Sequence, residues 1–286
     1  MLTHDIVLIK LKNMVKQRIS HDGVLRKILK PAWHLLNKHF HLWETSLNAV
    51  ELEITTFCNL ACFNCDRSVR QAPTGDSMSL EQVEKFVKES LDLNYKWGRI
   101  MILGGEPTLH PQFIEVLNTI KKYKEKNPDC VVGITTNGSG EKVRGIIDRT
   151  PDWVQIIDTH KQSNKQNFSS YNIAPIDITR YRKAVFSKGC ALTERCGLGL
   201  TRYGYFPCGA GASVARVFGF DIGFKKLSMV NRPVIKKQLS QLCCYCGHFK
   251  DAFEPESVSV SGEMTSPSWE AAYKAYKIKK PELTLY

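Results

Sequence analysis

Three cysteines lie within eight residues of this sequence, at Cys58, Cys62 and Cys65, and this triplet constrains the chain more than any other feature. The C-x3-C-x2-C spacing on a short loop lets three thiolates converge on one inorganic cube and leaves one iron without a protein ligand. An iron with an open position can bind a reacting molecule, as open positions do at other catalytic metals. A zinc site is the alternative, but it needs a fourth ligand nearby, and the neighbouring sequence offers only Asp66.

The ten cysteines of the 286-residue chain are best explained by metal binding or thiol chemistry. No apolar run is long enough to span a bilayer, and the N-terminus lacks the pattern of a secretory signal. We therefore expect a cytoplasmic protein, whose thiols stay reduced instead of forming disulfides. The net charge of +12 fits nucleic acid, a membrane surface, an anionic substrate such as a nucleotide-linked one, or simply a solvated lysine-rich surface.

The order of predicted elements divides the chain into four parts. Residues 1–46 form a basic amphipathic helical lead-in, which packs on the outside of the fold or rests on a membrane surface. Residues 47–185 alternate strands at 50–55, 99–103, 131–136 and 153–158 with helices at 79–93, 111–125 and 141–149; Ser79 and Gln82 have capping-box spacing. Residues 186–250 are a small cysteine-rich appendage, and 251–286 a tail with a short basic helix near 269–280.

Strand–helix alternation predicts an α/β fold with parallel strands, as a barrel or an open doubly wound sheet. In both architectures the loops at the carboxyl ends of the strands carry the site. The cysteine triplet, Gly104 and Asn137 all follow predicted strands directly, so we expect them to lie at one edge of the sheet.

The triplet after a strand resembles the radical S-adenosylmethionine (SAM) superfamily, and two later segments agree with it. The Gly104–Pro107 segment (Gly-Gly-Glu-Pro) looks like the element that holds the methionine amino group, and the Thr135–Gly138 segment (Thr-Thr-Asn-Gly) resembles the stretch near the ribose and methionine carboxylate. The resemblance implies a partial (β/α)6 TIM-like barrel, a 4Fe–4S cluster on the triplet, and bound SAM. The family usually has an aromatic residue before the last cysteine; here that position is Asn64. The implied cofactor-binding residues are Asn64, Gly104, Gly105, Glu106, Pro107, Thr136 and Asn137.

The later cysteines resemble a twitch domain, the shortened form of the SPASM domain that binds an auxiliary 4Fe–4S cluster. The resemblance implies Cys190, Cys208, Cys243 and Cys246 as its ligands, although Cys196 could replace one of them. A zinc ribbon is the alternative reading of these cysteines. Cys130, at the start of the third strand, is predicted to be an ordinary buried residue.

The resemblance implies that reductive cleavage of SAM gives a 5′-deoxyadenosyl radical, which abstracts a substrate hydrogen. An auxiliary cluster that removes the remaining electron makes the net reaction an oxidation, whereas a thiol that returns a hydrogen makes it an epimerisation. Cys196 and Cys244 are the candidate catalytic thiols. A reductant such as flavodoxin or ferredoxin is implied.

At this length, the chain resembles the butirosin-pathway aminocyclitol dehydrogenase and neomycin C epimerase types, so a sugar-type small molecule is the predicted substrate. Candidate substrate-binding residues are Asp158, His160, Lys161, Arg202, Tyr203 and Tyr205. A peptide or protein maturase is the rival enzyme. A zinc-stabilised basic nucleic-acid-binding protein is the rival of another class, but dispersed basic residues and the absence of a binding motif argue against it.

Overall fold

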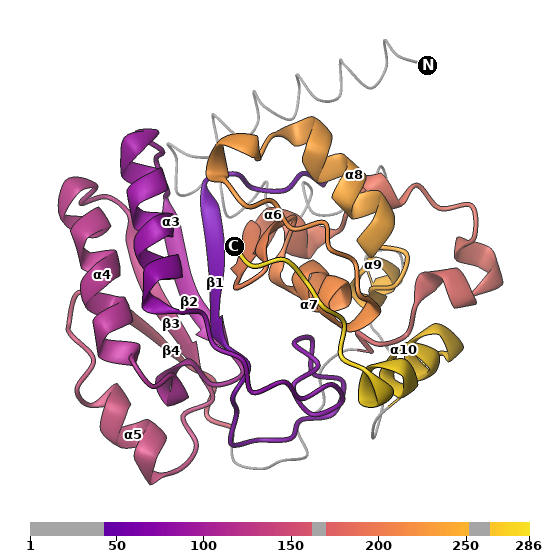
Figure 1. The fold of residues 1–286 in the computed structure, drawn as a ribbon, viewed down its shortest axis with the longest axis horizontal. Helices are drawn as coiled ribbons and strands as arrows, with labels where there is room; N and C mark the ends of the chain where they lie inside the picture. The colour runs from indigo at the N-terminus through magenta and orange to yellow at the C-terminus, as the bar shows by residue number, and fades with distance from the viewer. Residues whose placement is uncertain (1–42, 162–169, 252–263) are drawn as a thin grey trace, which may run out of the picture.

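The computed structural model describes residues 43–161, 170–251 and 264–286 (Figure 1). Most of the predicted N-terminal lead-in, residues 1–42, lies outside the described residues. None of the helices within the described ranges is both long and apolar enough to cross a bilayer.

The fold is built on one six-stranded sheet with the order β4-β3-β2-β1-β5-β6. Strands β1 to β4 are parallel, β5 is parallel to β1 on its other side, and β6 is antiparallel to β5. The α/β class and the six-stranded sheet of a partial barrel are confirmed, but the sixth strand closes a hairpin and is not a further strand–helix unit. The strands are β1 (Ala49–Thr55), β2 (Arg99–Gly104), β3 (Val131–Thr136), β4 (Gln155–Asp158), β5 (Leu198–Thr201) and β6 (Gly204–Phe206).

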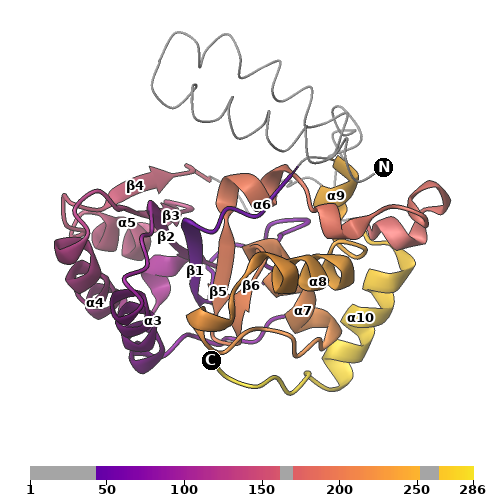
Figure 2. The same cartoon turned by 90° about the horizontal axis from the view of Figure 1, so that it is seen from above.

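Helices cover the sheet on two flanks, as Figures 1 and 2 show. On one flank, α3 (Leu80–Asp92), α4 (Phe113–Lys126) and α5 (Glu141–Ile147) connect the first four strands in turn. The predicted capping box at the start of α3 is present, with both reciprocal Ser79–Gln82 hydrogen bonds. Beyond β1 lie α6 (Ala191–Cys196), α7 (Gly209–Phe218), α8 (Arg232–Leu242), α9 (Gly247–Asp251) and α10 (Pro267–Ile278). The described residues also form short 3-10 helices, at Pro107–Leu109, Pro175–Asp177, Thr179–Tyr181, Phe186–Lys188 and Leu227–Met229.

The two faces of β1 have opposite chemistry, because successive side chains of a strand point to opposite sides. Val50, Leu52 and Ile54 are fully buried in the main hydrophobic core with residues of α3 and α4. Glu51 and Glu53 face the other side, where Arg67 forms ion pairs with both carboxylates. This alternation places an acidic stripe inside the fold, and it must be neutralised there.

The C-terminal helix α10 belongs to a second hydrophobic core. Trp269 is fully buried there with residues of α7, and its ring meets that of Phe218 edge-on, with centroids 4.9 Å apart. The helix predicted near 269–280 is therefore present, and one of its faces is anchored to the body of the protein.

Candidate active site

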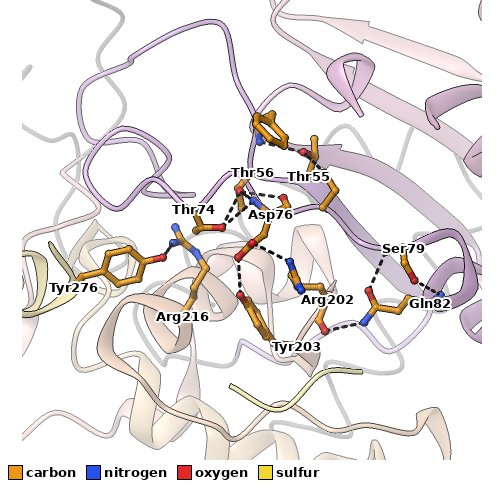
Figure 3. Close-up of polar contacts among 12 residues, drawn as sticks. Thr55, Thr56, Thr74, Asp76, Ser79, Gln82, Arg202, Tyr203, Arg216 and Tyr276 are labelled. Atoms are coloured by element: carbon orange, nitrogen blue, oxygen red, sulfur yellow. Dashed lines mark hydrogen bonds and ion pairs between the residues drawn. The ribbon is translucent and has the colours of Figure 1, made fainter. Parts of the chain in front are cut away.

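Residues 56–76 form a closed loop at the carboxyl end of β1, and this loop carries the cysteine triplet. At its base, the Thr56 N–H donates to the Asp76 carbonyl (2.8 Å), and the Met78 N–H donates to the Ile54 carbonyl (2.8 Å). Thr56 Oγ1 also accepts from the Asp76 N–H at 2.9 Å (Figure 3). The loop therefore leaves and rejoins the sheet at one point, which fixes the three thiols relative to the strand ends.

The three cysteines of the triplet line one pocket, which we call the first cysteine pocket. Gly105 after β2, Asn137 after β3 and Lys161 after β4 also line it, as do Leu60, Val69 and Arg70. Burial raises the pKa of Cys65 to about 11, and the Asp66 carboxylate adds to this effect. Because iron binds the thiolate, loading of this pocket must release protons. The strand ends therefore bring together three thiols, an amide and an amine, as the sequence predicted for this edge.

Gly104, the last residue of β2, and Gly105 are both required by the backbone of the cysteine loop. The N–H groups of Gly105 and Glu106 donate to the carbonyls of Thr55 (2.8 Å) and Phe57 (2.7 Å). A Cβ on Gly105 would stand 2.3 Å from the Phe57 carbonyl oxygen. The absence of a side chain at both glycines therefore lets the loop backbone approach the end of β2.

Gly105→Ala is therefore expected to destabilise the protein by about 1–3 kcal/mol, because the clash is with backbone and the loop must shift. Gly145→Ala is the matched control, since nothing lies within 4 Å of a Cβ at that helical position. The control should be neutral or stabilising by up to about 1 kcal/mol. Urea denaturation measures both variants, and equal stability of the two would contradict the prediction.

Glu106 is fully buried and joins the ends of β2 and β3. Its Oε1 accepts from the Thr108 N–H (3.2 Å), the Thr108 hydroxyl (2.8 Å) and the Thr136 hydroxyl (2.8 Å), and its Oε2 accepts from the Asn137 N–H (2.7 Å). A carboxylate has about four lone-pair sites, so a ligand ammonium group would have to share one of these. Asn137 in turn places Nδ2 2.9 Å from Asn59 Oδ1, which ties β3 to the cysteine loop.

Glu106→Gln should cost about 1–3 kcal/mol of stability, because the new NH2 group cannot accept a hydrogen bond and leaves a buried donor unpaired. The end of β3 should loosen, and SAM affinity measured by calorimetry should fall with it. Glu84→Gln, on the exposed side of α3, is the control for loss of a carboxylate charge. Wild-type stability and SAM affinity in Glu106→Gln would show that this carboxylate does not organise the site.

Asn64 lies beside the triplet but does not line the first cysteine pocket. It is fully buried with a positive φ of 52°, a conformation that asparagine tolerates better than most residues. Its Oδ1 accepts from the Met264 N–H at 3.1 Å. At the position where the family usually has an aromatic residue, this chain thus binds its own C-terminal segment.

A buried ion cluster, which sequence reasoning missed, links the cysteine loop to β1. Arg67 Nη2 lies 2.9 Å from Glu51 Oε2, and Nη1 lies 3.9 Å from Glu53 Oε2. A Cβ on Gly209 would stand 1.8 Å from Arg67 Nη1, so the guanidinium packs on the first residue of α7. The alternation of Glu51 and Glu53 with apolar residues in the strand was the available signal, because buried carboxylates require a basic partner.

Arg216 on α7 holds the same loop from the other side. It is buried, and its guanidinium donates to the carbonyls of Ala72 (2.8 Å) and Arg67 (2.9 Å). It also donates to the Tyr276 hydroxyl at 2.9 Å (Figure 3). The cysteine loop is therefore fixed by both halves of the chain.

The later cysteines separate into two groups in the structure. Cys190, Cys208, Cys243 and Cys246 line one pocket, which we call the second cysteine pocket. Cys208 caps α7, and its Sγ accepts from the Gly211 N–H at 3.3 Å, so the positive end of that helix faces this thiol. Burial raises the pKa of Cys208, Cys243 and Cys246.

Cys196 and Cys244 do not line either cysteine pocket. Cys196 lies beside Glu51, and burial together with this carboxylate raises its pKa to about 12. Cys244 Sγ donates to the Gln241 carbonyl at 3.3 Å, and burial raises its pKa to about 11. Cys130 is buried at the start of β3, as predicted.

The donor sets of the two pockets suit iron–sulfur clusters. The first offers three thiols and no histidine or carboxylate among the described residues that line it, which matches a cube with one open iron. The second offers four thiols, and His248 also lines it. Both are narrow, with volumes of about 30 and 10 Å³, so the fit rests on the donors and not on free space. Among the described residues, no three His, Cys, Asp or Glu side chains are arranged to hold a single metal ion.

The predicted substrate-binding residues lie in three places. Lys161 lines the first cysteine pocket, whereas Asp158 is 2.6 Å from Arg144 and His160 is largely exposed. Arg202 and Tyr203 both contact Asp76, at 3.0 and 2.9 Å (Figure 3). Tyr205 is fully buried, with its hydroxyl 3.4 Å from that of Tyr286. Only Lys161 is brought to the thiols of the first pocket.

A match to a known protein family includes the residues of this site. Residues 52–157 match the model of the Radical SAM superfamily, a segment that runs from β1 to β4 and includes the cysteine triplet. This segment of the chain is a radical SAM domain, which supports a radical SAM enzyme. This class implies a 4Fe–4S cluster and SAM as cofactors.

Similar curated proteins include a probable GTP 3′,8-cyclase of Methanococcus maripaludis, 36% identical over 92 residues, and one of Thermoplasma volcanium, 32% identical over 92 residues. The match covers 32% of this chain and 29% or 26% of those proteins, respectively, so the chain aligns with under a third of their length.

Among solved structures, the chain is similar to BtrN in complex with AdoMet and 2-DOIA, with a TM-score of 0.44 and 17% identity over 78% of this chain and 98% of that one. It is also similar to Streptococcus suis SuiB bound to the precursor peptide SuiA, with a TM-score of 0.32 and 19% identity over 47% of this chain and 29% of that one.

Proposed function

We propose that this enzyme uses SAM to oxidise or epimerise a sugar or aminocyclitol-type substrate, free or nucleotide-linked. The observation that carries the proposal is the first cysteine pocket, where three thiols meet Gly105, Asn137 and Lys161 at the carboxyl ends of parallel strands. A 4Fe–4S cluster held by these thiols would supply the electron for the cleavage of SAM. The similar curated proteins are named probable GTP 3′,8-cyclases, and this name supports a nucleotide-linked form of the substrate.

Different residues are proposed to bind the cluster and the separate parts of SAM. Cys58, Cys62 and Cys65 are the proposed iron ligands. The 104–107 segment and Thr136–Asn137 are proposed to bind the methionine and ribose moieties, and Asn64 is proposed to lie at the adenine end of SAM. Glu106 has the central position, since it joins both segments. Lys161 is proposed to bind the substrate beside the cluster.

The second cysteine pocket supports an auxiliary cluster of the twitch type, with Cys190, Cys208, Cys243 and Cys246 as ligands. Such a cluster would accept the second electron from the substrate after hydrogen abstraction, with a proton released to solvent, so that the net reaction would be a two-electron oxidation. A reductant of the flavodoxin or ferredoxin kind is the proposed partner. Cytoplasmic location and the domain boundaries of 46, 185 and 250 stay predictions.

Epimerisation requires a thiol that returns a hydrogen, and Cys196 is better placed for it than Cys244. Cys196 lies beside Glu51, on the face of β1 that carries the two glutamates. Cys244 follows the end of α8, and its thiol donates a hydrogen bond to the Gln241 carbonyl of that helix. Turnover in deuterated water separates the outcomes: an epimerase yields product with one solvent deuterium, and a dehydrogenase yields product two hydrogens lighter. An epimerase whose Cys196→Ala variant still incorporates deuterium would exclude Cys196 as donor.

The test of the proposed function is anaerobic purification and reconstitution, followed by iron and sulfide analysis and an assay for 5′-deoxyadenosine with SAM and dithionite. About eight irons per chain with deoxyadenosine formation is the expected result for two clusters. About four irons with turnover would keep the enzyme and remove the auxiliary cluster. Protein without iron and without SAM cleavage would overturn the proposal and favour the zinc-binding alternative.

A further inference from the structure

A second hollow lies beside the first cysteine pocket, between the end of the cysteine loop and α10. Its volume is about 600 Å³, within the range of small-molecule sites. We call it the basic cavity; its lining residues are Arg70, Gln71, Pro73, Thr265, Glu270, Tyr273, Lys274 and Lys277.

One face of α10 forms a wall of the basic cavity. Glu270, Tyr273, Lys274 and Lys277 follow the i, i+3, i+4, i+7 spacing of a single helical face. The opposite face is anchored by Trp269 and Tyr276, which are buried in the second core. Tyr273 also meets the cysteine loop, with its hydroxyl 3.1 Å from Ser68 Oγ. These contacts hold α10 in place, so the four side chains on this helical face line the cavity together.

Positive charge dominates among the described residues that line this cavity. They include three cations, Arg70, Lys274 and Lys277, and one carboxylate, that of Glu270. Both lysines are exposed, and Glu270 lies four residues before Lys274 on the same helix. Three cations in a concave site attract an anion more strongly than the same charges on a flat surface.

Arg70 connects the basic cavity to the first cysteine pocket, because it lines both. Its guanidinium lies 4.7 Å from the centre of the Phe63 ring, and Nη1 donates to the Ala61 carbonyl at 3.4 Å. A molecule bound in the basic cavity therefore lies next to the loop where SAM cleavage is proposed.

We propose that the basic cavity binds the phosphate groups of the substrate, so that its sugar part extends past Arg70 toward the first cysteine pocket. Lys274 and Lys277 bind phosphate oxygens, and the Glu270 carboxylate accepts hydrogen bonds from sugar hydroxyls. This inference rests on the proposed function for the identity of the substrate, but the anion site itself does not depend on radical chemistry. It narrows the substrate class to phosphorylated or nucleotide-linked sugars.

Calorimetry on the reconstituted enzyme tests the anion site with inorganic phosphate, inorganic pyrophosphate and a nucleoside diphosphate as probes. The variant is Lys274→Gln/Lys277→Gln, and the matched control is Lys279→Gln/Lys280→Gln, which removes the same charge from exposed positions at the end of the same helix. We expect pyrophosphate or the nucleoside diphosphate to bind the wild type and the control alike, and the cavity variant at least about tenfold more weakly. Tighter binding of the nucleoside diphosphate than of pyrophosphate identifies a nucleotide-linked substrate, and equal binding a simple sugar phosphate.

No binding to the wild type, or equal affinity of the cavity variant and the wild type, would overturn the phosphate site. Binding of a glutamate-rich peptide without binding of any phosphate probe would also overturn it, in favour of a peptide substrate. Deoxyadenosine formation is measured on the same preparations. Loss of the phosphate site with intact SAM cleavage leaves the radical function standing, whereas phosphate binding without SAM cleavage rejects the radical function alone.

Discussion

Replacing Cys62 with alanine is expected to lower the iron content from about eight to about four atoms per chain and to reduce 5′-deoxyadenosine formation more than about 100-fold. The reason is the composition of the first cysteine pocket: among the described residues that line it, no histidine or carboxylate could replace the lost thiolate. Iron analysis, low-temperature electron paramagnetic resonance of the reduced protein and the deoxyadenosine assay measure the effect.

Cys130→Ala is the control for loss of a buried thiol, because Cys130 is equally buried but lies in the core at the start of β3. It should keep the full iron content and the spectrum of both clusters. Circular dichroism of Cys62→Ala must match that of the wild type, so that loss of iron is not loss of fold. Full iron in a folded Cys62→Ala protein would exclude Cys62 as a cluster ligand.

Replacing Cys243 with alanine is expected to remove the other half of the iron, from about eight to about four atoms, and to leave SAM cleavage in place. Cys243 lines the second cysteine pocket with three other thiols, whereas the first pocket draws on separate residues. The variant should therefore still form deoxyadenosine but lose the two-electron oxidation product. One of the two cluster signals should disappear from the resonance spectrum.

Cys244→Ala is the matched control for this prediction, with iron content as the readout. The two cysteines are neighbours in sequence and both are buried, but only Cys243 lines the pocket. Cys244→Ala should keep all of its iron. The reverse result, with iron lost from Cys244→Ala and kept in Cys243→Ala, would show that the ligand set is wrong.

Local sequence signals predicted the first half of the fold well. The strands β1 to β4 and the helices between them follow from periodicity, and the start of α3 follows from the Ser79–Gln82 capping box. These features depend on residues a few positions apart, so the sequence shows them directly. The position of the cysteine triplet at the carboxyl edge follows from parallel strand order alone.

Long-range packing determines the second half of the fold. Residues 198–206 lie in the predicted cysteine-rich appendage, and the structure pairs β5 with β1, so that this segment extends the same sheet. The sequence between them spans more than 140 residues, and no local pattern specifies which strand a short apolar segment joins. The position of α10 also depends on long-range packing, because the burial of Trp269 against α7 holds this helix over the cysteine loop.

The amino-acid sequence alone shows the thiols, their spacing and the strand ends that carry them. The packed fold shows in addition which thiols share a pocket, that Arg67 pairs with Glu51 and lies near Glu53, and that α10 places a basic cavity beside Arg70. The difference arises because ligand type and periodicity are properties of neighbouring residues. Burial of charge and the shape of a cavity are set by residues far apart in the chain, which meet only when the core is packed.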